Sequence, residues 1–201
     1  MNMIFNKTMQ AVKDFDSIMN AAKEIYRNTK TEILATYTEA VSTEKLREAQ
    51  EILVNAETEA KQTARKAVQE DFEAIRSQVN EYVTAAVPSD FTASMAAVEA
   101  LGNDVTDAEA EAFINKYKGN YAAFRSLLKV LHGAGKATGI MAITVDVIRG
   151  QMEESERIIL NWIQTYKGGD YMSALLTNDE HTPIKALDEN VQAFLNGEYV
   201  L

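Results

Sequence analysis

A short glycine-containing run, residues 132–138, comes nearest to a known chemical motif in this sequence. It reads His-Gly-Ala-Gly-Lys-Ala-Thr, so a lysine follows a glycine as in a phosphate-binding loop. That motif also needs a glycine five residues before Gly135, where Val130 stands, and a serine or threonine where Ala137 stands. It needs a preceding strand as well, whereas the residues before this run favour a helix. We therefore interpret the run as a turn between helices.

The other side chains that could do chemistry are not arranged for it. His132 and His181 are far apart in the sequence, and neither has a second histidine or a carboxylate at metal-ligand spacing. No serine lies in the context of a nucleophile elbow, and the chain has no cysteine. Acidic residues are numerous, but the sequence singles out no pair of them for general acid–base catalysis. We expect no enzyme activity, no metal or cofactor, and no small-molecule ligand.

One stretch, from Ala112 to Val145, contains no acidic residue, although the whole chain has a formal net charge of −10. Aromatic residues alternate there with basic ones, a pattern that suits an acidic partner and, less well, nucleic acid. The alternative is internal: the bases pair with acids of the same chain, and the rings belong to the core. The candidate partner-docking patch comprises Lys116, Lys118, Arg125, Lys129 and Lys136.

The composition narrows the class of protein. A chain of 201 residues with 46% hydrophobic residues has material for one domain, or for a helical arm and a compact domain. Its negative charge argues against general binding to nucleic acid. No apolar run approaches the roughly 20 residues that span a bilayer, and residues 1–15 lack the continuous apolar core of a secretory signal. We expect a protein without a membrane span that is not secreted.

The first 87 residues contain neither glycine nor proline, and their composition favours helix throughout. Apolar residues recur at three, four and seven, which predicts a stripe that packs against another helix. Ile18 and Ile25 stand one residue before stripe positions, so the stripe is wider than a two-stranded seam. The predicted helix-pairing interface comprises Phe5, Val12, Phe15, Met19, Tyr26, Ile33, Leu46, Leu53, Val68, Phe72, Ile75 and Val79. Around Ala60, a run of alanines at spacing four would let two helices approach closely.

The arm has one interruption, at residues 41–44. Ser42 could cap a new helix there, with Val41 and Leu46 as a hydrophobic staple. The arm could instead be a single helix of about 85 residues, roughly 130 Å long. We favour a hairpin or kink at 41–44, although no glycine or proline marks it. The pattern leaves open whether the arm pairs within one chain or between chains.

Beyond Pro88 the sequence predicts shorter helices separated by glycines and capping residues. Thr106 and Glu109 form a capping box, and Asn120 can cap the next helix. Residues 140–148 have strand propensity, but no partner strand is apparent and their apolar spacing suits a helix, which we predict.

Two more helices complete the prediction, one at 151–167 ended by Gly168 and Gly169, and one that starts at Thr182-Pro183 and stops at Gly197. The fold class is therefore all-α. A long N-terminal coiled-coil-like helical arm, single helix or hairpin, occupies residues 1–87. A small, compact multi-helix bundle occupies residues 88–201.

The segment from Val105 to Leu131 resembles a sequence pattern in small helical proteins encoded by phages and prophages of Gram-positive bacteria. In that pattern an acidic helix with a capping box is followed by a turn. The turn corresponds to Lys116–Tyr121 of this chain, which reads Lys-Tyr-Lys-Gly-Asn-Tyr. The resemblance covers about 27 residues and implies no particular site. It implies a virion-assembly or accessory component, located in the host cytoplasm or associated with the virion.

Together these observations predict a non-enzymatic helical structural or interaction protein. Its long apolar stripe and strong acidity suit a phage scaffolding or virion-associated component that contacts protein partners and self-associates. The alternative is an acidic inhibitor or regulatory binder that masks a basic surface of a host protein.

Overall fold

The computed structural model describes residues 3–166, 183–197 and 199–200, which form helices joined by short connections. The all-α class predicted from the sequence is confirmed. The chain forms two compact units: residues 1–72 with 154–186, which we call the hairpin unit, and residues 73–153 with 187–201, which we call the bundle unit. This division differs from the expected boundary between residues 87 and 88, because one long helix contributes to both units. Among the described residues, no helix has the length and hydrophobicity needed to cross a bilayer.

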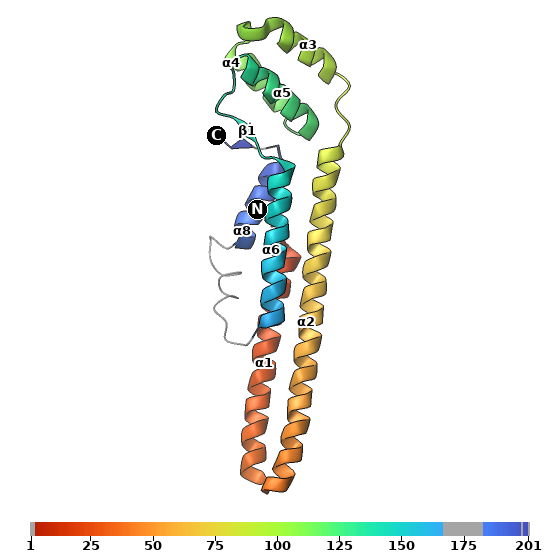
Figure 1. Cartoon of the computed structure of the whole chain (residues 1–201), viewed down its shortest axis with the longest axis vertical. Helices are drawn as coiled ribbons and strands as arrows, with labels where there is room; N and C mark the ends of the chain where they lie inside the picture. Colours follow the sequence, from red (N-terminus) through yellow and green to blue (C-terminus); the bar gives the residue numbers. More distant parts are fainter. Residues whose placement is uncertain (1–2, 167–182, 198, 201) are drawn as a thin grey trace. The chain divides into compact units, whose positions relative to one another are not determined.

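Two long helices make up most of the hairpin unit. Helix α1 spans Asn6–Thr36 and helix α2 spans Glu39–Thr84, of which the part up to Phe72 belongs to this unit. The two helices run side by side in opposite directions (Figure 1). The arm is therefore a hairpin that pairs within one chain, and the alternative of one continuous helix is excluded.

The bend of the hairpin lies at Tyr37 and Thr38, earlier than the predicted break at residues 41–44. Tyr37 has an extended backbone, with φ −116° and ψ 155°, which any L-residue adopts, so the bend needs neither glycine nor proline. The carbonyl of Thr38 accepts the first helical bond, from the backbone N–H of Ser42. Ser42 was therefore wrongly predicted as the cap: it is buried inside α2, and its hydroxyl donates to the carbonyl of Tyr37 at 3.1 Å.

The end of helix α6, which spans Val145–Thr165, completes the core of the hairpin unit. Its Trp162 and the following Tyr166 meet Phe15 of α1 edge to face, with ring centroids 5.4 and 5.1 Å from that of Phe15. Aromatic rings favour this geometry because the positive edge of one ring faces the negative face of another. The predicted end of this helix at Gly168 and Gly169 lies outside the described residues.

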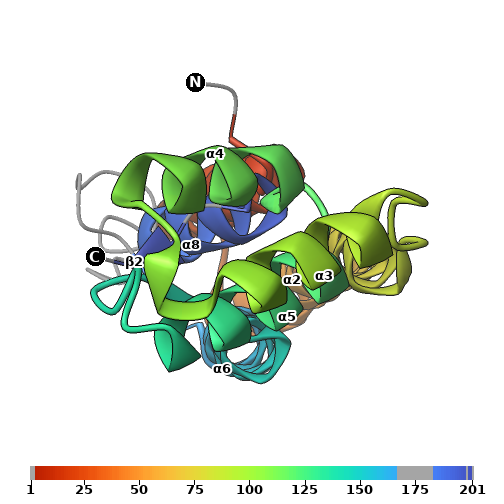
Figure 2. The ribbon, with the colours of Figure 1, turned by 90° about the horizontal axis from the view of Figure 1, so that it is seen from above.

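Three short helices form the core of the bundle unit: α3 (Phe91–Leu101), α4 (Asp107–Tyr117) and α5 (Tyr121–Gly133). The 3₁₀ turn η1 (Gly102–Asp104) follows α3. Helix α5 packs against both α3 and α4 (Figure 2). Their buried side chains form one cluster: Val98, Val105, Ala110, Ile114, Tyr117, Ala123, Phe124, Leu127, Leu128 and Leu131.

Both predicted caps in this unit are confirmed. The Thr106 side chain accepts a hydrogen bond from the backbone N–H of Glu109, whose carboxylate in turn accepts one from the backbone N–H of Thr106 at 2.9 Å. This backbone hydrogen bond, followed by one from the Thr106 hydroxyl, lowers the pKa of Glu109. The side chain of Asn120 accepts a hydrogen bond from the backbone of Ala123 at 3.0 Å and so caps α5.

The prediction of a helix over residues 140–148 was wrong for its first part. Met141–Ala142 forms a two-residue strand, β1, that pairs antiparallel with β2, Tyr199–Val200. The partner comes from the other end of the chain, so no local pattern could reveal it. Helix α6 begins only at Val145, and the last helix, α8, spans Pro183–Leu195. Its predicted first residue, Thr182, lies outside the described residues.

Candidate protein-binding surfaces

The predicted helix-pairing residues form the inner side of the hairpin and its continuation along α2. Across the hairpin, the rings of Phe5 and Phe72 meet with centroids 4.9 Å apart. Tyr26, Leu46 and Leu53 are only half-buried. The remaining predicted residues are buried: Phe5, Val12, Phe15, Met19, Ile33, Val68 and Phe72 in the hairpin unit, and Ile75 and Val79 in the bundle unit.

A buried carboxylate fixes how α1 starts against α2. Asp71 is 5% exposed, and its Oδ2 accepts two hydrogen bonds from Thr8, one from the backbone N–H and one from the hydroxyl, each 2.8 Å. The first turn of α1 contains no acid of its own, so Asp71 supplies both a cap and a negative charge at the positive end of the helix. Sequence reasoning missed this role because the two residues are 63 positions apart.

One side of the hairpin carries an open apolar groove. Near the start of α1 it is lined by residues that include Ala11 and Ile18 of α1 and Ala60 and Ala64 of α2. One turn further along each helix, a second hollow is lined by Ala22, Ile25, Tyr26, Thr29, Ala49, Ile52, Leu53 and Ala56. Because the two hollows adjoin along both helices, they form one groove, which we call the hairpin groove.

Large apolar side chains project from the hairpin groove into solvent. Ile18, Ile25 and Ile52 are 48%, 64% and 69% exposed. The groove floor is made of small residues, since Ala60 and Ala64 are almost fully buried. Exposed apolar side chains gathered along one side indicate a surface for a partner, whereas single ones do not. Ile18 and Ile25 occupy the flanking position noted in the sequence, so the broad stripe was the signal for this surface.

The other side of α1 is occupied within the same chain. The hydroxyl of Tyr166 donates to a carboxylate oxygen of Asp16, and the ammonium of Lys23 lies 4.9 Å from the centre of the Tyr166 ring. These contacts place the end of α6 on the side of the hairpin that carries Asp16, Asn20 and Lys23. The hairpin groove is lined by other residues of α1, and within the described residues these contacts of α6 and Tyr166 do not cover it.

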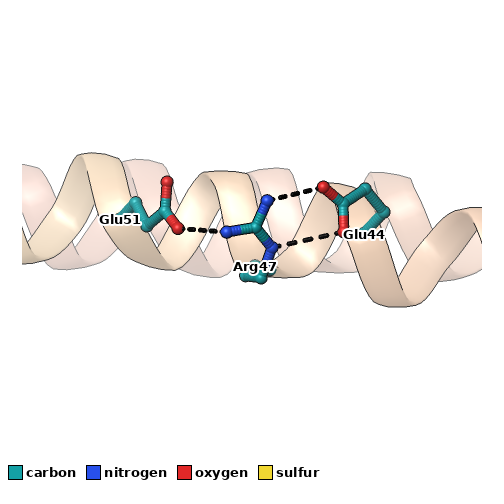
Figure 3. Close-up of polar contacts among 3 residues, drawn as sticks. All are labelled: Glu44, Arg47 and Glu51. Carbon is teal, nitrogen blue, oxygen red and sulfur yellow. Dashed lines mark hydrogen bonds and ion pairs between the residues drawn. The ribbon is translucent and has the colours of Figure 1, made fainter.

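Ion pairs cover the outer surface of α2 close to the bend. Arg47 lies between Glu44 and Glu51, 2.6 and 2.5 Å from their carboxylate oxygens (Figure 3). The hydrogen bond to Arg47 lowers the pKa of Glu44, and that to Glu44 raises the pKa of Arg47. All three side chains are exposed, so the network favours solubility and a straight helix more than it stabilises the fold.

The predicted basic patch is partly neutralised inside the bundle unit. Lys116 pairs with Asp90 at 2.6 Å, and Lys136 pairs with Asp107 at 3.0 Å. The hydrogen bond between Lys116 and Asp90 raises the pKa of the lysine and lowers that of the aspartate. These two pairs support the internal alternative for the residues concerned.

Other members of the basic stretch lie beside a groove of the bundle unit. Arg125, Lys129 and His132 follow one side of α5 and line an open groove of about 710 Å³ together with Met141 and other residues. The guanidinium of Arg125 donates to the hydroxyl of Tyr121 at 3.1 Å. The half-buried Lys118 contributes its backbone carbonyl, not its charge, to a contact with Tyr82. Two of the five predicted residues are thus paired with acids, and two others line this groove.

The side chains that could bind a metal are spread over the described parts of the chain. Within them, no three His, Asp or Glu side chains converge as a metal site. The Nε2 atom of His132 is 2.8 Å from the carbonyl of Ala137, where it closes the turn after α5. His181 lies outside the described residues. Comparison with protein-family models, curated proteins and solved structures gives no match to this chain.

Proposed function

We propose that this chain is a non-enzymatic helical structural protein that acts through protein–protein contacts made by its hairpin unit. The observation that carries the proposal is the hairpin groove, where Ile18, Ile25 and Ile52 project into solvent over a floor of alanines. Leaving such side chains in water forgoes roughly 1.5–3 kcal/mol for each one that a partner could bury. A second helical surface is the kind of partner that fits an open groove between two helices.

The resemblance of residues 105–131 to phage and prophage proteins supports the biological setting of the proposal. In that setting the protein is a scaffolding-like or virion-associated component, in the host cytoplasm or on the virion. The hydrogen-bonded network of Glu44, Arg47 and Glu51 suits a rod that stays separate and soluble until its groove is filled.

Site-specific photo-crosslinking tests the proposal in the producing cell. A photoreactive amino acid at Ile25 is expected to give a covalent adduct with another protein chain after irradiation. The control is the same amino acid at Gln62, which is also solvent-exposed on α2 but does not line the groove. If Ile25 gives no more protein adduct than Gln62, the proposed function is wrong.

A further inference from the structure

We infer that the occupant of the hairpin groove is the hairpin groove of a second copy of this chain, arranged antiparallel about a twofold axis. The inference rests on the proposed function and names its partner. The axis passes across the hairpin at the level of residues 57–58 of α2. At this level the helices face each other as α1 against α1 of the second copy, and α2 against α2.

The shape of the groove is suited to its own copy. It carries both the protruding isoleucines and the alanine-floored hollows that can receive them. In the antiparallel arrangement, Ile52 of one copy lies opposite Thr63 and Ala64 of the other. An apolar side chain of one helix then fills a space between small residues of the facing helix, as in coiled-coil packing.

The charged residues of α2 beside the groove favour an antiparallel pairing of the two copies. Glu70 lines the groove, and helical spacing places Lys45, Glu48 and Lys66 along the same edge of α2. The pair Lys45 and Glu70 is centred between residues 57 and 58, and the pair Glu48 and Lys66 is centred on residue 57. One twofold axis therefore places each lysine opposite a glutamate of the second copy. Lys66 and Glu70 already lie 3.8 Å apart within α2, so each new pair extends an existing network.

Two opposite charges on helix α1 independently give an axis within about one residue of this one. Lys7 lines the groove at its far end, and Glu32 continues the stripe of Ile18 and Ile25 toward the bend. The midpoint between Lys7 and Glu32 lies at residues 19–20. These residues are level with residues 58–59 of α2, about one residue from the axis found on α2, because Ile18 shares one hollow with Ala60 and Ala22 shares the next with Ala56.

A parallel pairing of the two copies places fewer of these residues opposite a residue of the other charge. It sets α1 of one copy against α2 of the other, which matches Lys7 with Glu70 and Glu32 with Lys45 but leaves Glu48 and Lys66 unmatched. In the antiparallel pairing the unfavourable contact lies close to the axis, where the two Glu59 residues are offset by about 5 Å along the helices and repel each other. Electrostatic complementarity of this kind sets direction and register more than affinity.

Cysteine crosslinking of the full chain tests this arrangement, because the natural sequence has no cysteine. We expect Glu59→Cys to form a disulfide-linked dimer under mild oxidation. The matched control is Thr58→Cys, which precedes Glu59 on α2, is about 100° away around the helix and lines neither hollow of the groove. The double variant Lys45→Cys, Glu70→Cys is expected to crosslink too. Its two cysteines are about 37 Å apart within one helix and cannot join inside a chain.

Light scattering completes the test by measuring association without a crosslink. The parent chain is expected to dimerise, Glu59→Gln to dimerise more tightly because it removes the like charges close to the axis, and Ile25→Glu to be monomeric at concentrations where the parent is dimeric. Crosslinking of Thr58→Cys as efficient as that of Glu59→Cys would overturn the antiparallel arrangement. So would a parent chain that stays monomeric. In that last case, an adduct from Ile25 to a different protein would leave the proposed function standing.

Discussion

Asp71 and Thr8, on different helices, are joined by two hydrogen bonds to one carboxylate oxygen, each 2.8 Å long. Oδ2 of Asp71 accepts both the backbone N–H and the hydroxyl of Thr8 in the first turn of α1. The contact sets the longitudinal register of the hairpin, and hence which residues of α1 and α2 lie together in the hairpin groove.

Replacing Asp71 by Asn is expected to destabilise the chain by about 1–3 kcal/mol. The amide keeps one acceptor but loses the charge that strengthens both hydrogen bonds and favours the helix N-terminus. Urea unfolding followed by far-UV circular dichroism measures the loss. The exposed Glu73→Gln, on the same helix, is the control. Equal midpoints for the two variants would show that the contact does not stabilise the hairpin.

Trp162 is buried, and within the described parts of the chain its indole Nε1 has no hydrogen-bond partner. Trp162→Phe removes this unsatisfied donor and keeps an aromatic ring against Phe15 and Tyr166, so we expect a loss below about 1.5 kcal/mol. Trp162→Ala leaves a cavity and should cost about 3–5 kcal/mol. Thermal unfolding by circular dichroism compares them. A Phe variant as unstable as the Ala variant would indicate that the indole N–H does have a partner.

Gly197 tolerates no side chain. Its φ is +65°, and a Cβ there would lie 1.7 Å from the carbonyl oxygen of Lys118. Gly197→Ala is therefore expected to cost more than about 3 kcal/mol or to displace the residues that follow α8. Gly135→Ala is the matched control: φ is +70° but the space is open, so only the backbone penalty of about 1–2 kcal/mol applies. Chemical unfolding of both variants tests this, and similar losses would contradict the steric argument.

The environment of Tyr82 predicts that the folded chain loses stability at alkaline pH. Burial raises its pKa above the ordinary value of 10.0, with a smaller contribution from Tyr121, and its hydroxyl donates to the Lys118 carbonyl at 3.0 Å. Folding therefore favours the protonated phenol. Its contribution is complete below pH 10 and is lost as the pH rises through the higher pKa of the folded state.

Comparing the parent chain with Tyr82→Phe isolates this group from the other tyrosines and lysines. Phenylalanine keeps the ring contacts with Phe194 and Tyr121, whose centroids lie 5.2 and 6.0 Å away. The variant should be less stable at neutral pH and should lose less stability between pH 9 and 11, measured by urea midpoints at each pH. If the urea midpoints of the two proteins fall equally with pH, the phenol of Tyr82 does not cause the alkaline loss of stability.

Local sequence signals predicted the parts of the fold that local physics determines. The apolar repeat that includes Phe5, Val12 and Met19 predicted α1 and its buried side, because helical spacing alone decides which side chains share a face. The cap at Thr106 was also readable, since both partners of the capping box lie within one turn. Composition and periodicity together were sufficient for the all-α class.

Features that depend on distant residues could not be predicted in this way. The bend at Tyr37 uses ordinary extended backbone and so has no residue signature. Strand β1 at Met141–Ala142 depends on β2 near the end of the chain. For the candidate surface, the stripe indicated that Ile18 and Ile25 widen the apolar side, but only the contacts of Tyr166 show which side of α1 another described segment covers.

The contact between Asp16 and Tyr166 joins residues 150 positions apart, whereas Thr8 and Asp71 are 63 apart. At roughly 5–20 residues per second, a ribosome needs on the order of 5–19 s to add the 95 residues that separate Asp71 from Tyr166. The hairpin can thus close, with its register set, well before α6 has been synthesised. For the dimer that we propose, nascent chains on neighbouring ribosomes of one message would expose finished grooves to each other in that interval, and pairing would begin during translation.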